Sequence, residues 1–335
     1  MAERATSRDV ARLAGVAQST VSYVLAGKGS ISAETRERVL RAVEELNYQP
    51  NLVARAMRTR RTGRVAVVMG LPIYNPVHML AGAGAAAEHA GYTMEVHSVD
   101  GHIGLRSRRV LELAGSGEFE GVLSFAPVEP GLETKAPPDV PIVTSANFDD
   151  EMHSAGELAD ATPVRLFIER LASLGHKRFL HVAGPSDFLS ARAREQVFIE
   201  TVERLGLESL GVVGHGWTGE IGVEAVRALP DDAPPVAVLA VNDLVAVGVM
   251  RGAAERGWSV PGDLSVTGWD NYDVGPFLSP SLTTVDNNRA EAGRRAMLRL
   301  VAALRKEAPP EYEEPLNQII WRESIASPDT QAGRQ

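Results

Sequence analysis

The stretch that decides the fold of this chain reads Thr6-Ser-Arg-Asp-Val-Ala-Arg-Leu-Ala-Gly-Val-Ala-Gln-Ser-Thr-Val-Ser-Tyr-Val-Leu25. Its apolar residues recur at the spacing of two short helices, one on each side of Gly15. These residues are Val10, Leu13 and Ala14 before the glycine, and Val21, Val24 and Leu25 after it. We therefore expect two helices that meet at a tight turn at Gly15.

Polar residues mark where the helices of this region begin. Thr6 followed by Asp9 is typical of a capping box, in which both side chains accept hydrogen bonds from free backbone N–H groups, so the first helix is predicted to begin near Ser7. Ser32 is a suitable N-cap for a third helix. That helix has apolar residues at i, i+4 and i+7, namely Val39, Val43 and Leu46.

The three predicted helices are short, so they depend on packing against one another. This packing leaves the polar face of the second helix outward, with Gln18, Ser19, Ser22 and Tyr23. An exposed helix fits the width of the DNA major groove. Residues 1–49 are thus predicted to form a helix-turn-helix DNA-binding domain.

Charge distinguishes the N-terminal region from the rest of the chain. Residues 1–64 contain 12 Lys and Arg and 6 Asp and Glu, a balance of +6. The other 271 residues contain 22 basic and 37 acidic residues, a balance of −15. Positive charge favours phosphate binding through counterion release, and an acidic body discourages nonspecific binding to polyanions. The alternative is a solvated helical face that merely happens to be basic.

Composition narrows the class of protein. A chain of 335 residues is too long for one ordinary core, so a small domain and a two-lobed body are expected. The absence of cysteine excludes disulfides, cysteine zinc sites and thiol catalysis. The N-terminus lacks the apolar segment of a signal peptide, and there is no apolar run long enough for a membrane span. We expect a cytoplasmic protein with no membrane partner.

After residue 64, apolar strands alternate with helical segments. The predicted strands are Val65–Gly70, Thr93–Ser98, Gly121–Phe125, Ile142–Ser145, Arg178–Ala183, Leu210–Gly214, Val236–Val241 and Leu264–Trp269. The predicted helices begin near Pro76 and Leu105 and span Ala191–Leu205, Gly219–Leu229, Asn242–Arg256 and Arg289–Leu304. This alternation is typical of parallel sheets covered on both faces, and it restarts once. We expect two doubly wound α/β lobes, with Gly82 and Gly84 allowing close packing of an alanine-rich helix.

The chain has no pattern of an enzyme or a metal site. Its eight histidines show no HExxH or other metal-ligand spacing, and no GxSxG, Walker A or GxGxxG sequence follows a strand and precedes a helix. We predict no catalytic residue, no metal and no cofactor. The alternatives are a sugar-modifying enzyme or an exported solute-binding protein. The latter would share the two-lobed body, but it would need a signal peptide and would have no use for a basic N-terminal region.

Several motifs follow one another along almost the whole chain. They are Asp9-Val-Ala-Arg-Leu-Ala-Gly-Val16, Thr20-Val-Ser22, Leu46-Asn-Tyr48, Leu174-Gly-His-Lys-Arg178, Ser190-Ala-Arg192, Val241-Asn-Asp243, Val260-Pro-Gly-Asp-Leu-Ser-Val-Thr-Gly-Trp-Asp270 and Pro280-Ser-Leu-Thr-Thr-Val285. In order and spacing they resemble the lactose/galactose repressor family of bacterial transcription regulators. The resemblance implies a periplasmic-binding-protein-like body, a ligand cleft between its lobes, and repression of carbohydrate genes.

The resemblance also implies how the chain is divided, with crossings between lobes near Ala161, Val285 and Ile319. The predicted parts are the helix-turn-helix domain at 1–49, a hinge helix or linker at 50–64, an N-terminal lobe at 65–160 and 287–318, a C-terminal lobe at 161–286 and 319–327, and a tail at 328–335. In the family, the hinge folds on DNA and inserts an apolar side chain into the minor groove, and Met57 has that position here. The alternative is a plain flexible basic linker.

The family's recognition helix assigns the DNA contacts. Base contacts fall on Gln18, Ser19 and Tyr23, where Tyr23 replaces a more usual arginine or histidine and so predicts a different base preference at one position. Residues that touch phosphate fix the register. They are predicted to be Thr20, Ser22, Ser32, Thr35, Tyr48, Asn51 and Arg55. Ala26 replaces a frequent asparagine, which puts one contact in doubt.

The resemblance places the polar effector contacts on Arg192, Asn242 and Asp270. A guanidinium, a carboxamide and a carboxylate together suit the vicinal hydroxyls of a sugar. Further effector residues implied by the family's positions are Trp217, His78, Tyr74 and Asn287. The alternatives are that Asn242 only caps a helix, that Arg192 pairs with a nearby carboxylate, and that Trp217 is a core residue.

The expected partners are double-stranded operator DNA, a sugar-like effector and a second copy of the chain. Two paired domains would read the two halves of a pseudo-palindrome, and ligand closure of the cleft would alter the pairing of the hinges. The resemblance implies that tetramers of the family use an added tail of leucine heptads, whereas the tail of this chain is polar and has none, so we expect a homodimer. In the cell it would associate with the nucleoid when bound to DNA.

Overall fold

The computed structural model describes residues 5–25, 31–48, 61–70 and 76–328. Within this chain, residues 1–63 and 64–335 form two compact units. Four predicted site residues lie outside the described residues. These are Asn51, Arg55, Met57 and Tyr74.

The first unit contains the three predicted helices, α1 (Ser7–Ala14), α2 (Gln18–Leu25) and α3 (Ala33–Glu45). The capping box is confirmed, since Thr6 Oγ1 accepts from the backbone N–H of Asp9 while Asp9 Oδ2 accepts from that of Thr6. Gly15 ends α1 with φ of 64°, the left-handed conformation that favours glycine. The core of this unit is small and aliphatic. Its buried residues are Val10, Ala11, Ala14, Val21, Val24, Val39 and Ala42.

One detail of the predicted core is wrong. Leu13 was expected to share the buried face of α1, but 46% of its surface is exposed, and Ala11 is buried in its place. Two helices pack against α1, and they enclose the smaller Ala11.

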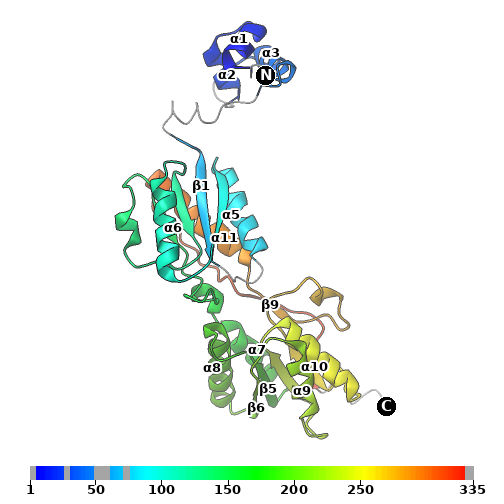
Figure 1. The fold of residues 1–335 in the computed structure, drawn as a ribbon. Coiled ribbons are helices and arrows are strands. Elements are labelled where there is room, and N and C mark those ends of the chain that lie inside the picture. Colours follow the sequence, from blue (N-terminus) through cyan, green and yellow to red (C-terminus); the bar gives the residue numbers. More distant parts are fainter. Residues whose placement is uncertain (1–4, 26–30, 49–60, 71–75, 329–335) are drawn as a thin grey trace. The chain divides into compact units, whose positions relative to one another are not determined.

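The second unit begins with a four-stranded parallel sheet of order β2-β1-β3-β4. Its strands are β1 (Arg64–Gly70), β2 (Thr93–Val99), β3 (Gly121–Ser124) and β4 (Ile142–Thr144). Helices α5 (Val77–His89) and α11 (Arg289–Arg305) cover one face, and α6 (Ile103–Gly115) covers the other (Figure 1). We call this sheet with its three helices the first lobe.

The apolar run of β1 is explained by burial on both faces of the sheet. Val65, Val67 and Met69 pack toward α5 and α11, while Ala66 and Val68 pack toward α6. The two helices on the first face cross very closely. A Cβ built on Gly82 of α5 would lie 1.8 Å from the carbonyl oxygen of Ala290, and one on Gly293 of α11 would lie 1.9 Å from that of Met79. The close packing predicted for Gly82 is thus confirmed.

The second lobe repeats this architecture, with a parallel sheet of order β6-β5-β7-β8. Its strands are β5 (Arg178–Ala183), β6 (Glu208–Gly214), β7 (Val236–Ala240) and β8 (Leu264–Thr267). Its helices are α7 (Thr162–Ser173), α8 (Leu189–Arg204), α9 (Gly219–Arg227) and α10 (Asp243–Glu255). Helices α7 and α8 pack on one face, and α9 and α10 on the other. The prediction of two doubly wound lobes is confirmed.

Among the described residues, three single-turn 3-10 helices and one short sheet complete the second unit. The turns are Leu132–Lys135, Gly156–Ala159 and Gly275–Phe277. Strands β9 (Thr284–Asp286) and β10 (Gln318–Ile320) pair antiparallel, with Val285 directly opposite Ile319. Two of the three predicted crossing points, Val285 and Ile319, therefore lie in one two-stranded ribbon. Among the residues described, no helix combines the length and apolar character that a membrane span requires.

Candidate functional sites

Helix α2 presents an uncharged polar surface. It contains neither acidic nor basic residues in its terminal turns, and Val21 and Val24 turn inward. Gln18 and Ser19 are exposed, and Tyr23 has 55% of its surface accessible. The Gln18 amide donates to Ser7 Oγ at 2.7 Å, a contact that orients it at the start of the helix. The three residues predicted to read bases therefore lie on one accessible helix.

The residues predicted to touch phosphate have local structural roles. Ser32 Oγ accepts the backbone N–H of Thr35 and donates to Thr35 Oγ1 at 2.9 Å, so the pair caps α3. Thr20 and Ser22 are half-buried on α2. Tyr48 is half-buried against the three-helix core. These contacts within the chain do not test whether the residues bind phosphate, so phosphate contact stays a prediction.

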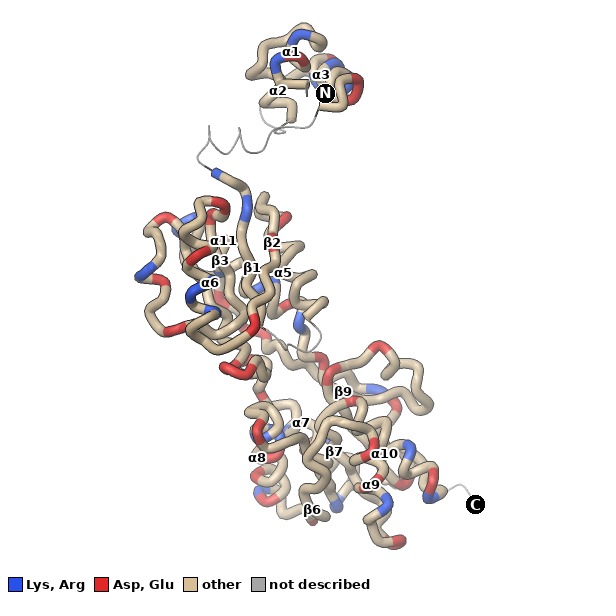
Figure 2. Tube along the Cα trace, in the orientation of Figure 1, with Lys and Arg blue, Asp and Glu red and all other residues tan. Residues whose placement is uncertain are grey.

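Most of the net positive charge of the N-terminal region lies in the linker sequence. Residues 49–64 contain five arginines and no acidic residue, which accounts for five of the six excess charges. On α1 and α3, basic and acidic residues are intermingled (Figure 2). Arg12 pairs with Asp9 at 2.5 Å, and Arg41 pairs with Glu37 at 3.3 Å. The excess positive charge that would attract phosphate is therefore encoded in the linker rather than in the three helices.

In the second unit, two separately predicted effector residues are joined. Asn287, just beyond β9, donates through Nδ2 to Asp270 Oδ1 at 3.0 Å. Burial raises the pKa of the Asp270 carboxyl, while the positive charges of Arg194 and Arg289 lower it. Asp270 has φ of 100°, a left-handed conformation that is unusual outside glycine. This combination of burial, charge and backbone strain is typical of a ligand site.

Arg194 was not predicted as a site residue. It is 6% exposed, donates through Nη1 to the carbonyl of Val241 at 2.6 Å, and lies 3.9 Å over the Trp269 ring. Burial lowers its pKa to about 10, and the Asp270 charge opposes that shift. Its Nε atom is buried without a hydrogen-bond partner. The structure thus brings a buried guanidinium toward the Asp270 carboxylate.

Arg192, the predicted guanidinium, lies on another face of α8. It is exposed and donates to the carbonyl of Ser186 at 2.6 Å. The signal that separates these two arginines is present in the sequence. Ser190, Arg194 and Phe198 follow one another at four-residue intervals and are all buried, whereas Arg192 is out of step with them. The role of Arg192 in effector binding stays a prediction.

Asn242 serves as the N-cap of α10. Its Oδ1 accepts the backbone N–H of Val245 at 2.8 Å, and its Nδ2 donates to the carbonyl of Trp217 at 3.3 Å. The structure thus shows the cap, and contact of Asn242 with an effector stays a prediction.

Trp217 is half-buried, packs against the core beneath α9 and α10, and meets Phe188 edge to face at 5.0 Å. Phe188 in turn stacks on His153 at 3.8 Å. His78 is exposed on the first turn of α5. The core role and the stacking role of Trp217 both fit this position.

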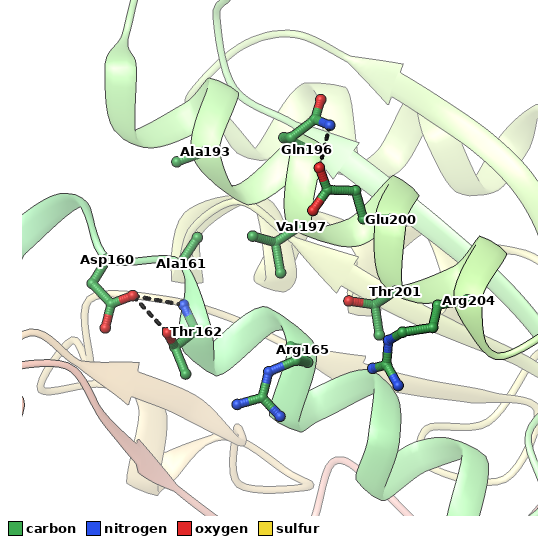
Figure 3. Close-up of a pocket in the computed structure, with 10 residues that line it drawn as sticks. All are labelled: Asp160, Ala161, Thr162, Arg165, Ala193, Gln196, Val197, Glu200, Thr201 and Arg204. Atoms are coloured by element: carbon green, nitrogen blue, oxygen red, sulfur yellow. Dashed lines mark hydrogen bonds between the residues drawn. The ribbon is translucent and has the colours of Figure 1, made fainter.

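A groove of about 480 Å³ lies between the start of α7 and α8 (Figure 3). Most of its polar side chains are already paired: Thr162 donates to Asp160 Oδ1 at 2.7 Å, and Gln196 donates to Glu200 at 2.6 Å. Arg165 and Arg204 both donate to Glu169. The predicted effector residues do not line this groove, so we do not assign the effector to it. Across residues 5–25, 31–48, 61–70 and 76–328, no cluster of acidic and histidine side chains suits a metal ion.

Two family models match the chain. One, described as bacterial regulatory proteins of the lacI family, matches residues 6–51, and one, described as a periplasmic binding protein-like domain, matches residues 168–325. The transcriptional regulator CelR of Thermobifida fusca is 32% identical over 314 residues, which cover 89% of this chain and 91% of that protein. The transcriptional repressor CytR of Escherichia coli is 30% identical and covers 89% of each.

Solved structures of two proteins of similar sequence share the fold of this chain. The lac repressor dimer bound to operator and the anti-inducer ONPF has a TM-score of 0.69 and 26% identity, over 97% of this chain and all of that one. The complex of CelR with cellobiose has a TM-score of 0.54 and 30% identity, over 96% of this chain and all of that one.

Proposed function

This chain belongs to the lacI family of bacterial regulatory proteins and is a DNA-binding transcriptional regulator, and we propose that it represses carbohydrate genes by binding a pseudo-palindromic operator as a homodimer that responds to a sugar-like effector. One observation carries this proposal. The uncharged polar side chains of Gln18, Ser19 and Tyr23 are exposed together on a helix packed in a helix-turn-helix arrangement.

The direct test of operator binding is a mobility-shift assay of the full chain with DNA from upstream of its own gene. We expect specific binding that survives excess competitor DNA and weakens steeply as salt rises, because linker arginines displace counterions from phosphate. Equal binding to scrambled DNA of the same composition would refute sequence-specific regulation.

We propose a dimer because a two-fold pair of recognition helices matches a pseudo-palindrome. The lac repressor structure similar to this chain is itself a dimer on operator. Met57 would act as the minor-groove wedge of the hinge, and Asn51 would contact phosphate there. Light scattering of the full chain, together with binding to half-site and full-site DNA, tests this assembly. A monomer with equal affinity for both DNAs would contradict it.

We place the lobe boundaries at the crossing points. The N-terminal lobe would comprise residues 65–160 and 287–318, and the C-terminal lobe residues 161–286 and 319–327. The direct pairing of Val285 with Ile319 supports this division, as does the packing of α11 against α5. Limited proteolysis of the full chain, with fragments identified by mass, tests these boundaries.

For the effector we propose a sugar or sugar derivative held by Asp270, Asn287 and Arg194, with Trp217 against its apolar face. The carboxylate and guanidinium suit sugar hydroxyls, and CelR has been solved with cellobiose. Effector binding would shift the population of DNA-competent dimers. A thermal-shift panel of cellobiose, D-ribose and sugar phosphates tests this, since a bound ligand stabilises by mass action. A hit unaffected by Asp270→Ala would refute the assignment.

We also propose that the protein has no catalytic activity and works in the cytoplasm, on the nucleoid when bound to DNA. The relatives named above are regulators. A sugar that stabilises the chain should therefore be recovered unchanged after prolonged incubation, and conversion to a product would overturn this part of the proposal.

A further inference from the structure

Asp243 is the most deeply buried carboxylate near the proposed effector site, with 1% of its surface exposed. It is the first residue of α10, directly after the cap Asn242. Its Oδ1 accepts from Thr284 Oγ1 at 2.5 Å, and its Oδ2 accepts the backbone N–H of Tyr272 at 2.7 Å. Both carboxylate oxygens are thus engaged, one by strand β9 and one by the loop after β8.

These contacts bracket Asp270. The backbone N–H of Asp243 donates to the carbonyl of Trp269 at 2.8 Å, immediately before Asp270, while its side chain holds Tyr272 two residues after it. Asp270 itself donates its N–H to Val285 at 2.9 Å. A non-glycine residue at φ of 100° persists only when its surroundings hold it there. The backbone N–H of Asp243 supplies that restraint on the Trp269 side, and its carboxylate supplies it on the Tyr272 side.

The approach of the carboxylate depends on a neighbouring glycine. A Cβ on Gly268 would lie 2.2 Å from Asp243 Oδ1. Strand β8 accordingly ends at Thr267, two residues before its predicted end at Trp269, and the chain turns around the Asp243 side chain.

We propose that Asp243 is a positioning residue of the effector site: its backbone N–H holds the chain before Asp270, and its buried carboxylate holds the chain after Asp270 and ties this loop to strand β9 through Thr284. This inference rests on the proposed effector site. In this role Asp243 does not touch the effector itself. Its effect is that Asp270 meets a ligand in one preset orientation.

Two charged groups act on the Asp243 carboxyl. Burial raises its pKa to about 6, the negative charge of Asp270 adds to that rise, and Arg322 opposes it. Arg322 is held in place by the carbonyl of Leu282 and by Asn271 Oδ1, each at 2.7 Å. Because its folded pKa lies above the unfolded value, Asp243 takes up a proton more readily in the folded chain. It should therefore favour the folded state increasingly as pH falls from about 6 toward 4.

The test separates position from charge with three variants of the full chain. Asp243→Ala removes both side-chain hydrogen bonds. Asp243→Asn keeps the shape, so that its amide can donate to Thr284 and accept from Tyr272, but it cannot titrate. Asp273→Ala is the matched control, because it truncates an exposed aspartate in the same loop. The first readout is amide hydrogen exchange of peptides covering residues 268–275, which needs no ligand.

We expect Asp243→Ala to lower protection of this segment at least tenfold, with Asp243→Asn and Asp273→Ala close to wild type. Asp243→Asn should differ from wild type in its pH profile, with a melting temperature that falls more steeply between pH 6 and 4. If residues 268–275 of Asp243→Ala exchange their amide hydrogens at the wild-type rate, the proposal is overturned. If that variant exchanges fast throughout the second lobe, Thr284→Val decides: local loss of protection supports the proposal, and wild-type exchange overturns it.

The second readout is the dissociation constant for cellobiose, or for whichever sugar of the panel stabilises the wild type. We expect at least tenfold weaker binding by Asp243→Ala and rescue by Asp243→Asn. Unchanged affinity in Asp243→Ala would overturn the positioning role. Failure of every sugar to bind the wild type would refute the proposed effector class, whereas the hydrogen-exchange result would still stand for or against Asp243.

Discussion

Asn287 donates a hydrogen bond to Asp270 across 3.0 Å, which joins the end of strand β9 to the loop that follows β8. The amide thereby fixes one carboxylate oxygen and leaves the other for a further donor. A sugar hydroxyl is such a donor. The pair therefore defines the direction from which an effector would meet Asp270.

We expect Arg194→Lys to weaken binding of a stabilising sugar at least tenfold, because lysine keeps the charge but loses the planar fork of donors. The measurement is the sugar-induced shift in melting temperature, compared with the shift of the wild type. Arg192→Ala is the control, since that side chain is exposed and bonded to Ser186. If Arg192→Ala loses more of the sugar-induced shift than Arg194→Lys does, Arg192 rather than Arg194 is the effector-binding arginine, as the sequence predicts.

Tyr23→Ala should relax base preference at one position of each half-site, by about 1–3 kcal/mol of discrimination. The side chain is 55% exposed on α2, so its removal leaves the three-helix core intact. Selection from randomised operators measures the change. An unchanged consensus would show that Tyr23 does not read a base.

Arg55→Ala provides the contrasting case, on a residue outside the described ranges. Loss of one phosphate contact should weaken binding to all sequences alike and reduce the salt dependence by about 0.9 in the log–log slope. Filter binding at several salt concentrations measures both. A sequence-dependent loss would point to base contact instead.

The fold could be predicted to the extent that its signals are local. Capping of α1 needs only Thr6 and Asp9, and the turn needs only Gly15, so these features followed directly from the chain. Strands buried on both faces, such as β1, are apolar runs that stand out between helices. Helix α7 was not assigned, although Val164, Phe167, Ile168 and Leu171 repeat at helical spacing. That omission was avoidable.

The candidate site could be predicted only in part, because it depends on tertiary contacts. Asp270 and Asn287 were named separately, but nothing in their spacing shows that they bond. The motif points to Arg192, whereas the four-residue spacing of Arg194 with Ser190 and Phe198 is the local signal that places Arg194 on the buried face. The role of Asp243 depends on a left-handed Asp270 and on Gly268, and neither the conformation nor the approach is written in a local pattern.

Buried His181 should make the protein sensitive to acid. Burial lowers its pKa to about 4. The ring nitrogen Nδ1 is hydrogen-bonded to the backbone carbonyl oxygen of Leu239 at 2.9 Å. Because the unfolded chain takes up the proton first, stability is lost as pH falls from about 6.5 toward 4, by about 3 kcal/mol at most. Urea unfolding of His181→Gln at pH 7 and pH 4.5 should show a smaller loss than wild type. Equal losses would mean that other groups dominate.

Gly82→Ala should destabilise the first lobe by about 1–3 kcal/mol or more, since its new methyl would meet the Ala290 backbone. Gly115→Ala is the matched control at the end of α6, where a Cβ meets nothing within 4 Å. It should be neutral or stabilising by up to about 1 kcal/mol. Thermal unfolding of both variants gives the comparison. Similar melting temperatures would show that α5 and α11 can separate without cost.

The crossing of α5 with α11 also sets an order of assembly on the ribosome. The first lobe buries Met297, Leu300 and Leu316, which are translated after the whole β5–β8 sheet. The core beneath α9 and α10 draws its buried residues from 180–282 alone. A nascent chain that ends before residue 289 therefore already contains the core beneath α9 and α10, while one face of the earlier-encoded sheet stays uncovered and must be shielded until α11 emerges.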